Sequence, residues 1–273
     1  MRLLLTAALL LAAPAAPARH LLVVCSPGAP GTTAEAQPTM DAFAAALSAK
    51  AGLQLAAVYD EAEQGGAARL RSRDAAVALV SLPFFLKHER ELGLRARLQA
   101  VPRGRPESER WTLVAKKGRA GAPAALEGFT VVSSAGFAPA FVRGPALGGW
   151  GPLPASARVV QSGAVLSALR RAAAGERVAV LLDGAQEAAL GSLPFAAELE
   201  VVTRSAPLPA GVVAAVDGRL PGKAWGAVEG ALRGMASDAA GASALEAIQM
   251  TRFAPLDEKA LAGARKAYAE AVR

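Results

Sequence analysis

The sequence predicts an α/β protein whose sheets are mainly parallel and flanked by helices. Short apolar runs alternate with stretches in which apolar residues recur at helical spacing, and this alternation continues through most of the chain. Several runs, such as residues 21–25, are apolar throughout, as expected for parallel strands that are covered on both faces. Two Pro-containing junctions, at residues 102–110 and 205–209, interrupt the alternation and divide the chain into three parts.

Before the first junction, strands and helices are expected in turn. Residues 21–25 form the first strand, and a loop rich in Gly, Pro and Thr follows it. Pro38 and Thr39 open the first helix, because proline is favoured in a first turn and apolar residues follow at helical spacing. Further strands are expected at residues 53–59, 75–80 and 97–101, and further helices at residues 67–72 and 84–92.

The same alternation resumes after the first junction. Strands are expected at residues 111–115, 129–132, 159–160, 178–182, 199–203 and 212–216. Helices are expected at residues 123–126, near Pro139, and at residues 164–174, 184–190, 222–235, 243–250 and 257–272.

The first residues predict a secretion signal. A positive Arg2 precedes the apolar residues 3–13, and the sequence APA at residues 16–18 has the small-x-small pattern that signal peptidase accepts. The apolar stretch is shorter than the roughly 20 residues that span a bilayer. We therefore expect cleavage after Ala18 and a periplasmic mature chain. A retained N-terminal anchor is the alternative.

Composition excludes several classes of protein. The only cysteine, Cys25, lies in an apolar run and leaves no intramolecular disulfide. The net charge of +7 favours anionic solutes or surfaces. Lys and Arg are nevertheless scattered, without the interleaved aromatic residues that stack on bases, so nucleic-acid binding is not expected. After the leader, no segment is apolar enough to span a membrane.

Nothing in the sequence predicts an enzyme. The two histidines are separate: His20 begins the mature chain, and His88 lies beside Glu89 and Arg90 on what we expect to be a solvated helix face. No metal-ligand spacing, P-loop or dinucleotide fingerprint is found. We therefore expect no catalytic residue, no metal and no cofactor. Trp111, beside the first junction, either lines a cleft or packs beneath it.

Five segments resemble one family. The sequence SAPLPAGVV at residues 205–213 resembles the returning hinge of the phosphate/phosphite/phosphonate-type solute-binding proteins of ABC transporters. Residues 231–235 are similar to the helix that follows, and residues 125–128 to the family's Leu-x-Gly turn. The SSAG sequence at residues 133–136 occupies the place of its Ser-Thr-Ser-Gly anion-binding turn, and residues 168–183 resemble its helix-Gly-strand-Asp unit.

The resemblance implies the type II periplasmic binding protein fold, in which two crossing segments hinge two lobes that each hold a mainly parallel sheet flanked by helices. The expected division is residues 1–18 as signal peptide, residues 19–110 and 206–273 as lobe 1, and residues 111–205 as lobe 2. The expected function is that of a monomeric receptor that captures a small anionic or polar solute, phosphonate- or phosphate-like, and delivers it to the membrane permease of an ABC transporter. Two alternatives stay open: an accessory or signalling protein that contacts a protein partner, and a periplasmic enzyme on the same scaffold.

The strongest candidate site is the turn at Ser133, Ser134 and Gly136. Where the chain enters a helix, serine hydroxyl groups and free backbone N–H groups can point toward one place and bind an anion there. The alternative is an ordinary helix N-cap, for which serine is also favoured.

The other candidate ligand residues follow strands, where ligands of open α/β sheets bind. They are Ser26, Thr32, Thr33, Ser81, Ser162 and Asp183. In the family a carboxylate at the place of Asp183 can hold a ligand's ammonium group, although Asp183 is equally suited to cap the next helix.

Two departures from the family weaken the expectation of a phosphonate. Ala135 replaces a serine of the anion turn, and residues 162–164 read SGA where many phosphonate binders carry a Ser-His-Glu-like cluster. A buried oxyanion that is left short of donors is costly. The site is therefore suited to a smaller or less polar solute, or has lost tight binding.

Overall fold

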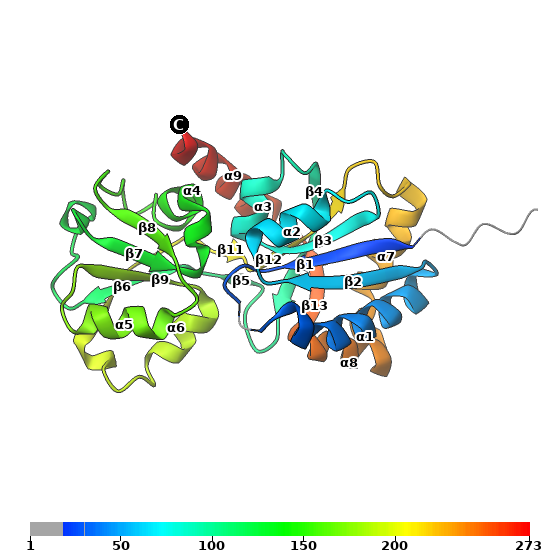
Figure 1. Cartoon of the computed structure of the whole chain (residues 1–273), viewed down its shortest axis with the longest axis horizontal. Coiled ribbons are helices and arrows are strands. Elements are labelled where there is room, and N and C mark those ends of the chain that lie inside the picture. The colour runs from blue at the N-terminus through cyan, green and yellow to red at the C-terminus, as the bar shows by residue number, and fades with distance from the viewer. Residues whose placement is uncertain (1–18, 30) are drawn as a thin grey trace, which may run out of the picture.

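The computed structural model describes residues 19–29 and 31–273, and the expected signal peptide lies outside them. Two sheets, each covered by helices, lie side by side along the long axis of the molecule, with a short two-stranded ribbon between them (Figure 1). Their strands come from different parts of the chain, because the first sheet combines residues before 103 with residues after 210.

The first sheet has six strands in the order β13-β4-β12-β3-β1-β2. β1 pairs in parallel with β2 and β3, whereas β12 and β13 run antiparallel to their neighbours. The strands are β1 (His20–Cys25), β2 (Leu55–Asp60), β3 (Ala75–Ser81), β4 (Leu94–Pro102), β12 (Gly211–Val216) and β13 (Met250–Pro255).

Helices cover both faces of this sheet. One face packs against α1 (Thr33–Ala51), α7 (Gly222–Arg233) and α8 (Ala239–Ala247) through a core that contains Phe43 and Leu47. The opposite face packs against α2 (Glu63–Leu70) and α3 (Leu82–His88) through a second core. Burial on both faces explains why the central strand β3 consists almost entirely of apolar residues.

The second sheet has five strands in the order β10-β6-β9-β7-β8, with β6 antiparallel to its neighbours. The strands are β6 (Thr112–Lys116), β7 (Thr130–Ser133), β8 (Arg158–Gln161), β9 (Val178–Leu182) and β10 (Leu199–Arg204). The helices are α4 (Pro139–Phe141), α5 (Val165–Ala173) and α6 (Gly184–Leu190), and short helical turns lie at Pro123–Leu126, Ser134–Phe137, Val142–Ala146 and Ala196–Glu198. One further turn, Met235–Ser237, follows α7 beside the first sheet.

The chain passes between the sheets twice, and the two passages are tied together. β5 (Ser108–Glu109) pairs antiparallel with β11 (Leu208–Pro209) to form the ribbon. Beside it, the backbone N–H of Trp111 donates to Ser205 Oγ at 2.9 Å, and the N–H of Ser205 donates to the Trp111 carbonyl at 2.8 Å. These bonds couple the two passages into one narrow link.

The last helix, α9 (Glu258–Val272), bridges the two halves. It packs on the helical turns at residues 139–146, while Arg265 forms an ion pair with Glu89 at 2.9 Å beside the first sheet. A Cβ atom on Gly144 would lie 2.3 Å from the carbonyl oxygen of Ala267, so only glycine permits this close approach. Helix α9 is thus a third connection between the halves.

The expected strands and helices are largely present. Several bounds are shifted by a few residues, and three differences are larger. Helix α1 begins at Thr33, because Thr32 and Glu35 form a capping box, and Pro38 lies inside the helix. Helix α8 ends at Ala247, and Met250 begins strand β13 on the edge of the first sheet. The two-residue strands β5 and β11 were not predicted, because they are too short to show a periodic pattern.

The expectation for His88 was wrong. Its ring is buried, contacts the ring of Phe84 with centroids 4.6 Å apart, and places Nε2 2.8 Å from Glu63 Oε1. Within the described ranges, no helix is long and apolar enough to cross a membrane. Those ranges also contain no cluster of three His, Cys, Asp or Glu residues suited to a metal ion.

Cys25 should be chemically inert in the folded protein. Burial, together with the charges of Asp60, Glu63 and Glu61, raises the pKa of its thiol to about 12. Because the thiolate is the reactive form, iodoacetamide at pH 8 should leave Cys25 unmodified in buffer and modify it completely in 6 M guanidinium. Mass spectrometry reads the modification, and rapid labelling under native conditions would show that the strand opens.

Candidate functional site

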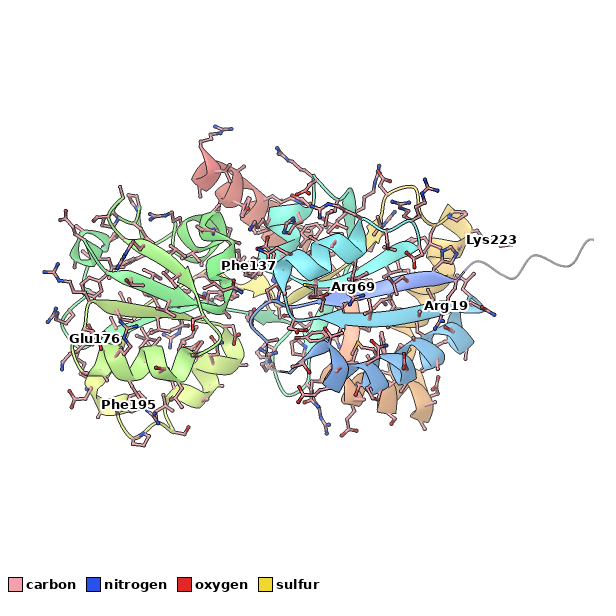
Figure 2. All side chains as sticks on the ribbon, in the orientation of Figure 1. Arg19, Arg69, Phe137, Glu176, Phe195 and Lys223 are labelled. Atoms are coloured by element: carbon pink, nitrogen blue, oxygen red, sulfur yellow. The ribbon has the colours of Figure 1, made fainter. Side chains whose placement is uncertain are left out.

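A cavity of about 800 Å³ lies between the two sheets. Its walls come from the ends of β1 and β3 in the first sheet, from the turn after β7 and from helix α6 in the second, and from the ribbon. Phe137, a wall residue on the turn after β7, lies where the two halves meet (Figure 2). Both halves are therefore needed to form the wall of the cavity.

Four of the predicted ligand residues line this cavity. Ser26 and Ser81 follow β1 and end β3, and Ser134 and Asp183 face them from the second half. Their convergence follows from topology, because the carboxyl ends of parallel strands meet at one edge of a sheet. The other five predicted residues, Thr32, Thr33, Ser133, Gly136 and Ser162, are not part of the cavity wall.

The two threonines begin helix α1. The side chain of Thr32 accepts a hydrogen bond from the backbone N–H of Glu35 and donates one to its carboxylate. Thr33 Oγ1 donates to Glu61 Oε2 at 2.5 Å. Both hydroxyl groups thus serve the helix terminus and the loop beside it.

Ser133 and Gly136 serve the packing of the second sheet. Ser133 is fully buried, and its hydroxyl donates to the Leu181 carbonyl at 2.9 Å while accepting from the N–H of Ala135. A Cβ on Gly136 would lie 2.3 Å from the backbone nitrogen of Gln161, so the turn requires glycine. Of the SSAG turn at residues 133–136, Ser134 and Ala135 line the cavity, whereas Ser133 and Gly136 do not.

Asp183 and Ser162 both act as local caps. Asp183 Oδ1 accepts from the N–H groups of Ala185 and Gln186 at 2.9 Å, and Gln186 completes a capping box. Ser162 Oγ accepts from the N–H of Ala164 at 3.0 Å. The capping role of Asp183 is therefore confirmed, and it coexists with a place on the cavity wall.

The first junction supplies two charged wall residues that sequence analysis missed. Glu109 lies on β5, where its carboxylate accepts from the N–H of Gly184 at 3.2 Å and lies 3.5 Å from Arg105. Burial, followed by the nearby charge of Asp183, raises the pKa of Glu109 to about 7, although the Gly184 N–H and Arg105 oppose the shift. In the sequence, the signal that could have pointed to Glu109 as a wall residue is its place inside a Pro-containing junction between the lobes.

Three polar atoms on wall residues lack hydrogen-bond partners in the described part of the chain. They are the hydroxyl groups of Tyr59 and Ser81 and the indole Nε1 of Trp111. Buried polar groups of this kind are usually paired, so their shared location calls for an explanation. These atoms have almost no accessible surface, so the three residues line the cavity through their other atoms.

Two contacts hold the halves together beside the cavity. Lys87 Nζ on α3 donates to the carbonyl oxygen of Phe137 at 2.7 Å, and it also pairs with Glu63 at 2.7 Å. Gly28, with φ of 84°, lies so close to Ser134 that a Cβ would fall 2.9 Å from the serine Cβ. The loop after β1 therefore touches the turn after β7 directly.

No family model and no curated protein matches the sequence. Solved structures do match. XAC2383 from Xanthomonas citri bound to chloride is 16% identical, with a TM-score of 0.73 over 92% of this chain and 98% of that one. The binding-protein component PA3383 of a Pseudomonas aeruginosa ABC phosphonate transporter is 14% identical, with a TM-score of 0.65 over 93% and 87% of the two chains. PhnD1 from Prochlorococcus marinus, in complex with methylphosphonate, is 11% identical, with a TM-score of 0.60 over 92% and 97%.

These similarities establish the class of fold. The chain has the two-lobed architecture of type II periplasmic binding proteins, with a mixed, helix-flanked sheet in each lobe, as the sequence predicted.

Proposed function

We propose that this protein is a solute receptor that binds one small molecule in the cavity between its lobes and works by hinge motion. The observation that carries the proposal is the cavity itself, whose wall joins both lobes and brings Ser26 of the first together with Ser134 and Asp183 of the second. An open form admits the solute, and closure adds contacts from the second lobe. The free energy that favours closure is the difference in solute affinity between the two forms.

We further propose that the receptor is periplasmic and monomeric, is not an enzyme, and delivers its solute to the permease of an ABC transporter. The resemblance in sequence nominates a small phosphonate- or phosphate-like anion as the solute. Ser26 and Ser134 can each donate a hydrogen bond to an acidic group, and Arg105 is a cation on the same wall, although Glu109 lies beside it. We propose the same division of the lobes, with residues 19–110 and 206–273 as lobe 1 and residues 111–205 as lobe 2.

A thermal-shift titration of residues 19–273 tests solute capture. The panel contains phosphate, phosphite, sulfate, alkyl phosphonates, amino acids and small carboxylates. A ligand at a thousandfold above its Kd stabilises the protein by about 4 kcal/mol, which corresponds to an increase in Tm of roughly 8 to 16 °C. A panel without any saturable shift contradicts the proposal and favours the accessory protein that contacts a protein partner.

Ser134→Ala tests whether the solute binds in the cavity. Ser134 is a buried wall residue, and its hydroxyl forms no hydrogen bond with the described residues, so its removal costs no internal hydrogen bond. We expect unchanged stability and about tenfold weaker solute binding in a titration. Thr112→Val is the matched control, since it deletes another buried hydroxyl without a partner, on a residue outside the cavity wall. Equal affinities of the two variants would place the solute elsewhere.

A further inference from the structure

Most of the cavity wall is apolar. Its larger apolar side chains are Val24, Met40, Leu79, Phe137, Ile248 and Met250, contributed by both lobes. Val24, Ile248 and Met250 remain partly exposed to the cavity or to solvent. Apolar side chains that converge on one hollow favour a ligand that removes them from water.

The charges on the wall do not suit a small oxyanion with two negative charges. The charged residues of the described wall are Arg105, Glu109 and Asp183. Arg105, the cation among them, lies 3.5 Å from the Glu109 carboxylate, and Asp183 adds a second acidic group. A desolvated dianion needs several donors or opposite charges around it, and here two carboxyl groups share its surroundings.

The size of the cavity also exceeds the needs of an inorganic ion. Pockets of about 300–1,000 Å³ typically bind drug-sized molecules, and this cavity has about 800 Å³. The serine hydroxyl groups of the wall, such as those of Ser26 and Ser134, are few compared with the apolar residues around them. Such a wall combines a large apolar area with a small number of points for hydrogen bonds.

We infer that the solute is an organic molecule with a substantial apolar body and one compact polar end, rather than a small inorganic oxyanion. This inference rests on the proposed capture of a solute in the cavity. The apolar body contacts Val24, Met40 and their neighbours, and the polar end takes hydrogen bonds from the serines of the wall, Ser26 and Ser134. A carboxylate, phosphonate, hydroxyl or amine end meets this description, as long as the body is apolar.

Two homologous series of ligands test the inference. Isothermal titration of the mature protein with methyl-, butyl- and octylphosphonate, and with the n-alkyl alcohols of the same lengths, separates the polar end from the apolar body. We expect affinity to rise about fourfold for each added methylene group in at least one series, because burial of a methylene contributes about 0.8 kcal/mol.

Each other outcome is distinct. If the methyl compound or phosphate binds and longer chains bind no better, the apolar body is refuted while solute capture stands. If no member of either series binds, and phosphate, amino acids and carboxylates do not bind either, both the inference and the proposed function fail.

A pair of valine variants locates the apolar body. Val24→Thr keeps the shape of the side chain and adds a hydroxyl to the cavity wall, so octyl compounds should bind at least threefold more weakly and methyl compounds equally well. Val58→Thr is the matched control, because Val58 is also partly buried but packs against the core on the other face of the first sheet. An unchanged ratio of octyl to methyl affinity in Val24→Thr would refute the proposed contact.

Discussion

Replacing Glu109 with glutamine should raise the free energy of unfolding relative to the wild type, and this gain should be about 3 kcal/mol larger at pH 8 than at pH 5. The carboxyl group is buried on the ribbon between the lobes, close to Asp183, and its pKa is about 7 instead of the ordinary 4.5. Glutamine keeps the size of this side chain and one acceptor oxygen for the Gly184 N–H, but it does not titrate. The difference between variant and wild type therefore isolates the cost of ionising Glu109.

The sign follows from proton linkage. Between pH 4.5 and pH 7, the unfolded chain has already lost the Glu109 proton while the folded chain still holds it. A folded state that binds more protons than the unfolded state loses stability as the pH rises. The free energy of unfolding of the wild type therefore falls between pH 4.5 and pH 7, and above pH 7 Glu109 causes no further loss. Urea unfolding at pH 5 and pH 8 measures the effect.

The control for this prediction is on the same junction. Glu107 is about half exposed, and Glu107→Gln should change the free energy of unfolding by less than about 0.5 kcal/mol at either pH. If Glu109→Gln follows the same pH profile as the wild type, the carboxyl group ionises in the fold without a penalty.

Gly136→Ala should destabilise the protein by about 3 kcal/mol, the upper end of the usual cost of overpacking. The added Cβ would lie 2.3 Å from the backbone nitrogen of Gln161 and 2.4 Å from the carbonyl carbon of Val160. Backbone atoms of strand β8 cannot rotate away as a side chain does, so the turn after β7 must move. A lower midpoint of urea unfolding with an unchanged m-value is the expected measurement.

Gly163→Ala is the matched control for this glycine. A Cβ at Gly163 would meet only the carbonyl oxygen of Gly28, at 3.9 Å, which is ordinary contact. Its unfolding midpoint should therefore stay close to that of the wild type. Equal midpoints for Gly136→Ala and Gly163→Ala would contradict a tight approach of the turn to β8.

Strong local patterns allowed individual strands and helices to be predicted, and weak patterns account for the errors. The two-lobed arrangement was expected from the family resemblance. The run at residues 178–182 is apolar throughout and is a strand with those bounds. Pro38 misled the prediction of helix α1, because the capping box at Thr32 outweighs the preference of proline for a first turn. Met250 was assigned to a helix, although its pairing with Pro102, a contact between residues distant in the chain, makes it part of a strand.

The site shows the same limit. Serines at strand ends, such as Ser81 and Ser134, were found because topology brings such ends together. Ser133 belongs to the same short sequence, but it is the last residue of β7, where side chains alternate between the two faces of the sheet. Its hydroxyl donates to the Leu181 carbonyl instead of facing the cavity. Glu109 was not found, because its burial depends on a ribbon formed by two segments about a hundred residues apart.

Helix α9 determines where the molecule can pivot. Leu261 and Ala264 belong to the same buried core as Phe141 and Val142, so separating the helix from the second lobe would expose that core to water. A rotation about an axis along this packed edge avoids that cost. The cavity, in contrast, is lined by residues of α1, by Ala247 at the end of α8 and by residues 248–250, on the opposite face of the first sheet. The lobes should therefore part on the side of α1 and α8, which makes that side the entrance for a solute.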